Sequence, residues 1–154
     1  MTRRRLSVDG QPVEVDAALG ESLLSVLRSA GRTAPKLACG RGECGACTVQ
    51  IDGRPVMSCA ILAATVTGDV VTAESVARTS PDLGEAFADN IAFQCGFCTP
   101  GQIVRADALL RDNPCPSRAE VAQGMIGNVC RCTGYVQIVD AVCDVARQRE
   151  AAPQ

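Results

Sequence analysis

The sequence predicts an α+β fold in which a small β-grasp sheet domain precedes an all-helical domain. In the first half, short alternating runs of apolar and polar residues end in Asp-Gly turns, which is typical of β-hairpins. In the second half, apolar residues recur three or four positions apart, as they do in helices. The pattern changes around residues 74–83, where Ser80 precedes Pro81, so we expect the linker there and divide the chain into domains 1–76 and 77–154.

The first domain is expected to hold five strands and one helix. The expected strands are residues 4–8, 12–15, 48–51, 54–57 and 69–73. Turns at Asp9-Gly10 and Asp52-Gly53 make hairpins of the first four. The helix starts near Ser22 and ends at Gly31, with Leu23, Leu24, Leu27 and Ala30 at helical spacing. A small sheet, one helix across it and a long glycine-rich loop over 39–47 form a β-grasp arrangement.

Four helices are expected in the second domain. They cover residues 82–90, a segment from 99 to about 112, a short segment after 117, and 135–149. Thr99 would cap the second helix, with Pro100 at its first position. Ser117 and Glu120 fit a capping box for the third, which ends near 124–128. The apolar stripe of the last helix contains Val139, Val142, Cys143 and Ala146.

Composition excludes several classes of function. The formal net charge is −2 and no stretch is strongly basic, so the footprint of a nucleic-acid-binding protein is missing. We expect no membrane span, because no apolar run reaches the required length. The chain contains no histidine, which excludes a Rieske centre, His-ligated zinc and any Cys-His or Ser-His dyad.

Ten cysteines point to metal or redox chemistry. No apolar signal segment follows the early arginines, so we expect a cytoplasmic protein with reduced thiols. Arg3 to Arg5 could belong to a twin-arginine export signal, but the alternation over 6–15 favours a hairpin there. In a reducing compartment, clustered cysteines favour metal binding over a disulfide framework.

The first cysteine set is Cys39, Cys44, Cys47 and Cys59. The spacing C-x4-C-x2-C with a distant fourth cysteine is that of plant-type [2Fe–2S] ferredoxins. Three glycines alternate with these cysteines, as a backbone that turns tightly around a cluster requires. Their amide groups could donate hydrogen bonds to the sulfurs and tune the reduction potential. A structural four-cysteine zinc site is the alternative.

The second cysteine set is Cys95, Cys98, Cys130 and Cys132. Each pair lies just before an expected helix, where the helix N-terminus favours an anionic cluster. By spacing alone this set could also bind zinc or be a thioredoxin-type dithiol, although the latter needs a βαβ unit that this half lacks. We interpret the remaining two cysteines, Cys115 and Cys143, as a loop thiol and a small core residue.

Three sequence stretches resemble the small iron–sulfur subunit of the molybdenum hydroxylases, the xanthine dehydrogenase and aldehyde oxidase family. The stretches are Cys44-Gly45-Ala46-Cys47-Thr48-Val49 with Ser58-Cys59, Gln94-Cys95-Gly96-Phe97-Cys98-Thr99-Pro100-Gly101, and Gly127-Asn128-Val129-Cys130-Arg131-Cys132-Thr133-Gly134-Tyr135. The resemblance spans residues 6 to about 145. It implies a ferredoxin-like β-grasp domain followed by a four-helix-bundle domain, each with one [2Fe–2S] cluster.

The resemblance also implies partners and roles. Gln94 and Cys132 match residues that lie against the pterin of molybdopterin, here expected in its cytosine dinucleotide form, on a large molybdenum-cofactor-binding subunit. A medium FAD-binding subunit is one candidate acceptor. The substrate is oxidised on the large chain, so we expect no catalytic residue here. The chain departs from the family at 80–87, which lacks a Leu-His-Pro run, and at Gln102, where an apolar residue is common.

Two other functions stay open from sequence. A free-standing ferredoxin-like carrier needs only the first cluster and is usually strongly acidic, unlike this chain with its net charge of −2. A zinc-stabilised interaction module would be colourless, whereas [2Fe–2S] proteins are red-brown.

Overall fold

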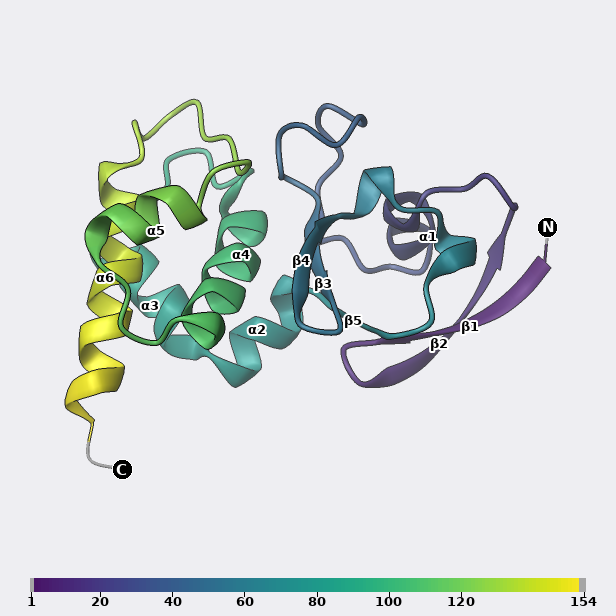
Figure 1. Ribbon diagram of the computed structural model, residues 1–154. Helices are drawn as coiled ribbons and strands as arrows, with labels where there is room; N and C mark the ends of the chain where they lie inside the picture. The colour runs from purple at the N-terminus through teal and green to yellow at the C-terminus, as the bar shows by residue number, and fades with distance from the viewer. Residues whose placement is uncertain (1, 153–154) are drawn as a thin grey trace.

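The computed structural model describes residues 2–152, which form a sheet half and a helical half side by side (Figure 1). The strands are β1 (Thr2–Val8), β2 (Gln11–Ala17), β3 (Thr48–Ile51), β4 (Arg54–Met57) and β5 (Asp69–Val71). The α-helices are α1 (Leu23–Ser29), α2 (Ala73–Thr79), α3 (Pro81–Asp89), α4 (Thr99–Asp112), α5 (Arg118–Gly124) and α6 (Val136–Ala151). Two 3₁₀ turns, η1 (Ser58–Ala60) and η2 (Ala63–Thr65), connect β4 to β5.

The sheet has the strand order β2-β1-β5-β3-β4. Only the β1–β5 pair is parallel; the other three pairs are antiparallel. Both predicted hairpins are confirmed, and both residues of Asp52-Gly53 have positive φ (51° and 80°), as a tight two-residue hairpin turn requires. β3 and β4 have the predicted bounds, while β1 and β2 extend further than predicted.

Helix α1 covers one face of the sheet and closes the first core. Its N-cap is Ser22, whose side chain accepts a hydrogen bond from the Ser25 N–H, as predicted. The buried residues of this core include Leu6, Val8, Val15, Leu23, Leu27, Val49 and Val70. The apolar faces of β1, β3 and α1 therefore hold this half together.

The helical half differs from the sequence prediction in two details. The linker expected over 74–83 is wrong, because α2 forms behind the N-cap Thr72 and α3 already begins at Pro81. Thr99 is not a cap but the first residue of α4, and the N-cap is the preceding residue, Cys98 (φ −83°, ψ −14°). The capping box of Ser117 and Glu120 is confirmed. Since α2 spans residues 76 and 77, the domain boundary placed there stays a prediction.

A second core fills the space among the helices. Its buried residues include Val76, Leu83, Phe87, Val104, Leu110, Val121, Ile138 and Val142. Within the described part of the chain, none of the helices has the length and apolar character that crossing a membrane needs.

The two halves meet where α4 packs on β3 and β4. Gln50 of β3 is fully buried there, and its Nε2 donates to the Val104 carbonyl (2.9 Å) and to Oδ2 of Asp107 (2.8 Å). Ser80 donates to the other Asp107 oxygen at 2.9 Å, and Arg111 hydrogen-bonds to Oε1 of Gln50. Because these buried polar groups satisfy one another, the interface fixes one orientation of the halves.

Candidate metal centres

The first cysteine set lies on the loop between α1 and β3 and on η1. All three predicted glycines adopt positive φ: Gly40 (+68°), Gly42 (+76°) and Gly45 (+70°). On this backbone the Cys39 and Cys44 thiols are neighbours, and so are those of Cys47 and Cys59, since the two side chains of each pair interact. The Gly42 N–H donates to the Cys59 sulfur at 3.2 Å.

The loop is also electrostatically suited to thiolates. Backbone N–H groups of Arg41, Glu43 and Cys44 point at the Cys39 sulfur and lower its pKa to about 6. Burial raises the pKa of Cys59, and the neighbouring Cys47 thiol raises it further, while the Gly42 N–H acts in the opposite direction. A bound cation or an iron–sulfur cluster would supply the positive charge that buried thiolates need.

The second cysteine set lies on the two loops that precede α4 and α6, as predicted. The sulfurs of Cys95 and Cys132 are 3.6 Å apart, and the thiol of Cys98 contacts that of Cys130. Two thiolates that share a tetrahedral metal with metal–sulfur bonds of about 2.3 Å lie roughly 3.8 Å apart. The Cys95 and Cys132 sulfurs therefore have the spacing of two ligands on one metal atom.

Hydrogen bonds shape the second set as well. Burial and the adjacent Cys130 thiol raise the pKa of Cys98 to about 12. Burial also acts against the Cys130 thiolate, but hydrogen bonds from the Thr133 side chain and backbone outweigh it and lower this pKa. The Cys130 N–H donates to the Tyr135 hydroxyl oxygen at 2.9 Å, which fixes the loop against the start of α6.

The pairing of thiols bears on which metal fits. Over residues 2–152, no group of three or more cysteine or carboxylate side chains gathers around one point that could hold a single ion. A structural zinc ion needs four such ligands around it. A [2Fe–2S] cluster instead needs two thiolates on each iron, because bridging sulfides complete the coordination of both irons. The Cys95–Cys132 pair, with its sulfurs 3.6 Å apart, has the arrangement that one iron of such a cluster requires.

Gln94 and Cys132, the two residues that the family resemblance places against a pterin, are neighbours in the structure. Nε2 of Gln94 donates to the Cys132 carbonyl oxygen at 3.0 Å. Both residues are exposed, and so is Cys95. The second set is thus open on the side where these three residues lie.

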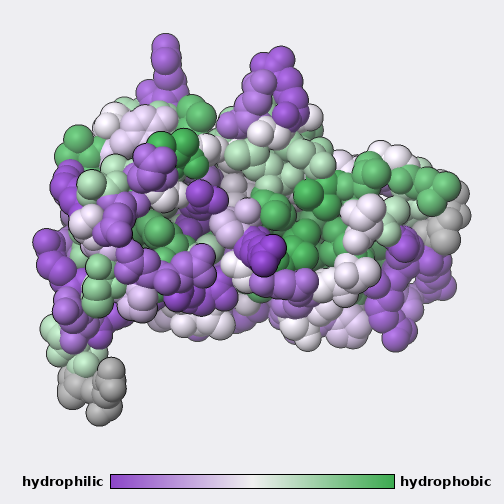
Figure 2. All heavy atoms as spheres, viewed as in Figure 1, coloured by the Kyte–Doolittle hydropathy of each residue, from purple (hydrophilic) through white to green (hydrophobic). Residues whose placement is uncertain are grey.

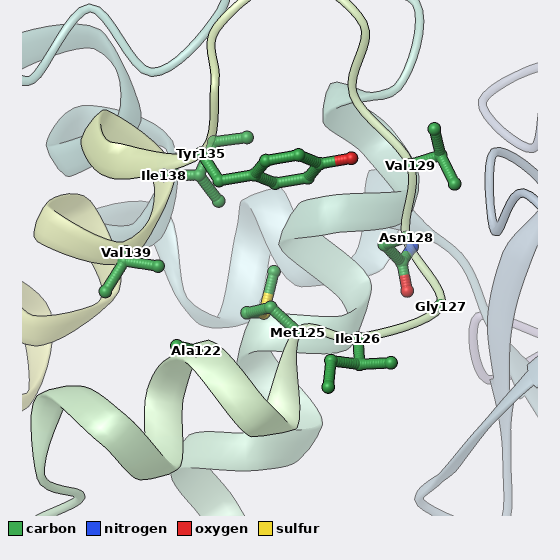
Figure 3. Close-up of a pocket in the computed structure, with 9 residues that line it drawn as sticks. All are labelled: Ala122, Met125, Ile126, Gly127, Asn128, Val129, Tyr135, Ile138 and Val139. Atoms are coloured by element: carbon green, nitrogen blue, oxygen red, sulfur yellow. The ribbon is translucent and has the colours of Figure 1, made fainter.

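Apolar side chains surround this open side. Among the residues that the structure describes, seven of the ten exposed large hydrophobic side chains lie in segments 91–97 and 126–136: Ile91, Phe93, Phe97, Ile126, Val129, Tyr135 and Val136. A pocket of about 320 Å³ opens between α5, the 126–129 loop and the start of α6, with Met125 pointing into it and the Tyr135 ring along its edge (Figure 3). On the face seen in Figure 2, apolar atoms gather beside α5 and again over η1 and η2.

The two cysteine sets touch each other through residues that sequence reasoning did not single out. The Val129 N–H donates to the Cys44 carbonyl at 2.8 Å, and the Asn128 amide reaches the Gly45 carbonyl at 3.0 Å. Both residues stand in the third motif stretch, just before Cys130, but nothing in their spacing indicated a contact with the first set. Cys115 and Cys143 lie elsewhere, on a hollow between α6 and the loop before α5.

Glycine-rich loops that pair eight thiols in two sets define a protein that carries two iron–sulfur centres. Comparison with known proteins agrees. A family model described as a 2Fe-2S iron-sulfur cluster binding domain matches residues 6–78, and one described as a [2Fe-2S] binding domain matches residues 72–143. Both clusters are therefore expected on this chain, one in each half.

Individual relatives indicate which group of iron–sulfur proteins the chain resembles. The chain is 42% identical to the nicotinate dehydrogenase small FeS subunit of Eubacterium barkeri, over 89% of this chain and 90% of that one. It is 40% identical to the xanthine dehydrogenase iron-sulfur-binding subunit of Escherichia coli O157:H7, over 93% of each chain. A chain of quinoline 2-oxidoreductase from Pseudomonas putida 86 superposes with a TM-score of 0.90, at 39% identity and 97% coverage of both chains.

The chain belongs to the family of small iron–sulfur subunits of the molybdenum hydroxylases, the xanthine dehydrogenase and aldehyde oxidase group. It is an electron-transfer subunit of such an oxidoreductase. In the aldehyde oxidoreductase from Desulfovibrio desulfuricans, 41% identical with a TM-score of 0.91, this chain spans only 17% of a much longer polypeptide.

Proposed function

We propose that Cys39, Cys44, Cys47 and Cys59 ligate one [2Fe–2S] cluster and Cys95, Cys98, Cys130 and Cys132 the other. The pairing of thiols supports this proposal, above all the 3.6 Å between the Cys95 and Cys132 sulfurs. One iron of the first cluster would take Cys39 and Cys44, and the other Cys47 and Cys59, since the side chains of each pair interact. The second cluster would divide into Cys95 with Cys132 and Cys98 with Cys130.

When bound, each cluster supplies one-electron redox chemistry, and the residues around it supply position and hydrogen bonds. Donors already lie at the sulfurs: the Gly42 N–H at Cys59 and the Thr133 hydroxyl at Cys130, each 3.2 Å away. Hydrogen bonds of this kind stabilise the more negative, reduced state and so raise the potential. Helices α3 to α6 would form the four-helix bundle around the second core, with α2 as the connecting helix; the shared buried core supports this description.

The second set is the proposed point of electron entry. Gln94 and Cys132 are exposed and hydrogen-bonded to each other, so both are available to a cofactor on another chain. From the family resemblance, that cofactor is molybdopterin in its cytosine dinucleotide form. The large molybdenum subunit would cover the apolar residues around this end, because exposed Ile126, Val129 and Val136 favour burial in a partner.

The first set is the proposed point of exit. Cys59 and Gly40 line a separate hollow of about 290 Å³ beside α1, together with Leu37, which is 60% exposed. A medium FAD-binding subunit is the acceptor that we propose for this surface. Its placement at the opposite cysteine set leaves the entry side free for the large subunit. A cytoplasmic location is proposed as well, because clusters of cysteines that bind metal are typical of a reducing compartment.

Metal analysis of the purified complex tests the two-cluster proposal. We expect four irons and four acid-labile sulfides per chain, because each set of four thiolates completes one two-iron cluster. Two irons, or stoichiometric zinc, would refute it. The entry surface is tested by co-purification with the large chain: Ile126→Asp should weaken assembly, whereas Leu19→Asp, at a site that is also well exposed but lies in the sheet half, should not.

A further inference from the structure

The loop of the first cysteine set is pressed against the helical half. A Cβ atom on Gly45 would lie 2.4 Å from the Gly127 carbonyl oxygen, and one on Gly101 would lie 2.4 Å from the Gly45 carbonyl oxygen. Real Cβ atoms do not approach other atoms so closely, so neither position accepts a side chain. The segment between Cys44 and Cys47 is thus in direct backbone contact with the segments next to Cys98 and Cys130.

One side chain joins the three segments. Asn128 is 6% exposed, and its Nδ2 donates to the Gly45 carbonyl oxygen (3.0 Å) and to the Thr48 hydroxyl oxygen (3.1 Å). The Thr48 hydroxyl in turn donates to the Gly45 carbonyl at 2.7 Å. Both amide hydrogens of Asn128 are therefore directed at the first-set loop.

Asn128 is itself held from the other side. Gln102 of α4 is 1% exposed, and its Nε2 donates to the Asn128 main-chain carbonyl at 2.8 Å. This contact explains the departure at Gln102 that the sequence showed, because a buried apolar side chain could not bind that carbonyl. Gln102 lies one helical turn after Cys98, so the anchor of Asn128 is tied to the loop of the second set.

These contacts keep intact a short through-bond route between the two cysteine sets. From the Cys44 sulfur, the route follows the Cys44 side chain to its carbonyl, crosses the 2.8 Å hydrogen bond to the Val129 N–H, and reaches Cys130 through one peptide unit. Electron transfer by tunnelling slows steeply as the gap between centres widens. The geometry of residues 127–129 therefore governs how fast an electron can cross.

We propose that Asn128 is the positioning residue for electron transfer between the two clusters. Its amide clamps the Gly45 carbonyl, and so holds Cys44 at the Val129 N–H. The role rests on the proposed function, since it requires a cluster in each set. Asn128 acts through its hydrogen bonds to Gly45 and Thr48 and through the adjacent backbone.

The test uses the full chain with both clusters, in three variants. Asn128→Asp keeps the shape of the side chain but replaces both amide donors with an oxygen that faces the Gly45 carbonyl. Gln102→Leu keeps Asn128 and removes only its support. Asn90→Asp is the matched control: the Asn90 amide also donates two hydrogen bonds, to Ala86 and Asp144, but both lie within the helical half.

Two measurements follow after iron and sulfide are counted. The first is the magnetic splitting between the two reduced clusters in low-temperature paramagnetic resonance, which depends on their separation. The second is hydrogen exchange, followed by mass spectrometry, in peptides containing Val129. Asn128→Asp should reduce the splitting and speed exchange there about tenfold, the factor for a lost hydrogen-bonding contribution of about 1.4 kcal/mol. Gln102→Leu should act in the same direction, more weakly.

The control should lower the melting temperature and leave the splitting and the exchange at Val129 unchanged. The proposal is overturned if Asn128→Asp and Gln102→Leu both retain four irons and show the native splitting and native exchange. It is equally overturned if Asn90→Asp reduces the splitting as much as they do, since the role would then be general stability. A native chain with fewer than four irons would instead refute the two-cluster function, so the two failures are distinguishable.

Discussion

The backbone N–H of Val129 lies 2.8 Å from the carbonyl oxygen of Cys44, to which it donates a hydrogen bond. Cys44 belongs to the first cysteine set, and Val129 precedes Cys130 of the second. The two sets are therefore not independent sites on neighbouring domains. Their loops are in direct backbone contact, so we expect a change in the backbone of one loop to shift the other.

Gly45→Ala should be strongly destabilising. Its φ of +70° is unfavourable for alanine, and the new Cβ would lie 2.4 Å from the Gly127 carbonyl oxygen. We expect a loss of about 3 kcal/mol, from backbone strain plus overpacking. Chemical unfolding followed by far-ultraviolet circular dichroism measures it.

Gly96→Ala is the control for that experiment. Gly96 lies between two cysteines of the second set and has a similar φ of +75°, but a Cβ there would meet no atom within 4 Å. The free energy of unfolding should therefore fall by only about 1 kcal/mol, the cost of placing alanine in the left-handed backbone conformation. Equal losses in the two variants would show that the contact between the loops contributes nothing.

Asp107→Ala should lower the free energy of unfolding by weakening the interface between the two halves. Asp107 is 5% exposed and accepts hydrogen bonds from Gln50 and Ser80, which would be left buried without their acceptor. A loss of about 2 to 4 kcal/mol is expected in the free energy of unfolding. Asp140→Ala, which removes an exposed ion pair with Arg118, should cost less than about 1 kcal/mol in the same assay. A larger loss in Asp140→Ala than in Asp107→Ala would show that the buried hydrogen bonds between the halves do not stabilise the fold.

Local sequence signals predicted the elements whose ends are set by local chemistry. The β3–β4 hairpin was predicted to the residue because Asp52-Gly53 can form its turn at little cost. The sequence predicts a linker where α2 forms, because this helix has only seven residues and Val76 is its one fully buried residue. It is stabilised by packing on the second core, which no local pattern reveals.

The contacts between the halves could not be predicted from one sequence. Along β3, alternation places Gln50 on the other face of the sheet from Val49 and Ile51, where a polar residue is expected to meet solvent. Gln50 is nevertheless 0% exposed, because α4 covers that face. Asn128 likewise lies in a loop, and the spacing of the cysteines around it does not predict its contact with Gly45. The proposed thiol ligands are different: their spacing reflects the geometry of the metal centre itself, so the sequence alone was sufficient to propose them.

Cys115→Ser and Cys143→Ala should leave the visible and paramagnetic spectra of the clusters unchanged. The two residues lie on a hollow with Arg118 and Arg147, and eight other cysteines complete both sets. Cys143 is partly buried against the second core, so its loss should cost about 1 kcal/mol through a small cavity. Disappearance of one cluster signal in either variant would show that the assignment of ligands is wrong.

Stability should fall at acidic pH partly through Asp82. Hydrogen bonds from Arg149, at 2.7 and 3.0 Å, hold the pKa of Asp82 below its usual value despite partial burial. A carboxylate with a lowered folded-state pKa stabilises the fold above its unfolded pKa of about 3.9, and this contribution is lost as the pH falls through the lower value.

The matching variant is Asp82→Asn, which removes the titrating group. Both side chains remain about one-third exposed, so the difference in unfolding free energy between native and variant should be only about 0.5 to 1 kcal/mol near neutral pH. It should shrink below about pH 4 as Asp82 takes up a proton. A difference that stayed constant down to pH 2 would exclude Asp82 as a contributor to the acid transition.

The order of electron transfer can be tested by damaging one set at a time in the assembled complex. Cys47→Ser should impair the first cluster, so substrate still reduces molybdenum and the second cluster while turnover with the external acceptor falls sharply. Cys132→Ser should do more harm, because Cys132 is proposed both to bind iron and to meet the pterin. The first transfer to iron should then slow as well, and the large chain should bind its cofactor less tightly.

Gln94→Ala provides an intermediate case that isolates the pterin contact. Its Nε2 donates to the Cys132 carbonyl at 3.0 Å without ligating iron, so all four irons should remain. The interaction that holds the pterin should weaken by about 1 to 3 kcal/mol if a buried polar group is left unpaired in the complex, and transfer to the second cluster should slow as a result.

The measurement mixes each complex rapidly with substrate and follows the two cluster signals separately by freeze-quench paramagnetic resonance. Since the second set faces the partner in the proposed arrangement, Cys132→Ser must delay both signals and Cys47→Ser only the first cluster's. If Cys47→Ser abolished reduction of the second cluster while Cys132→Ser spared it, electrons would enter at the first set, and the proposed order would be reversed.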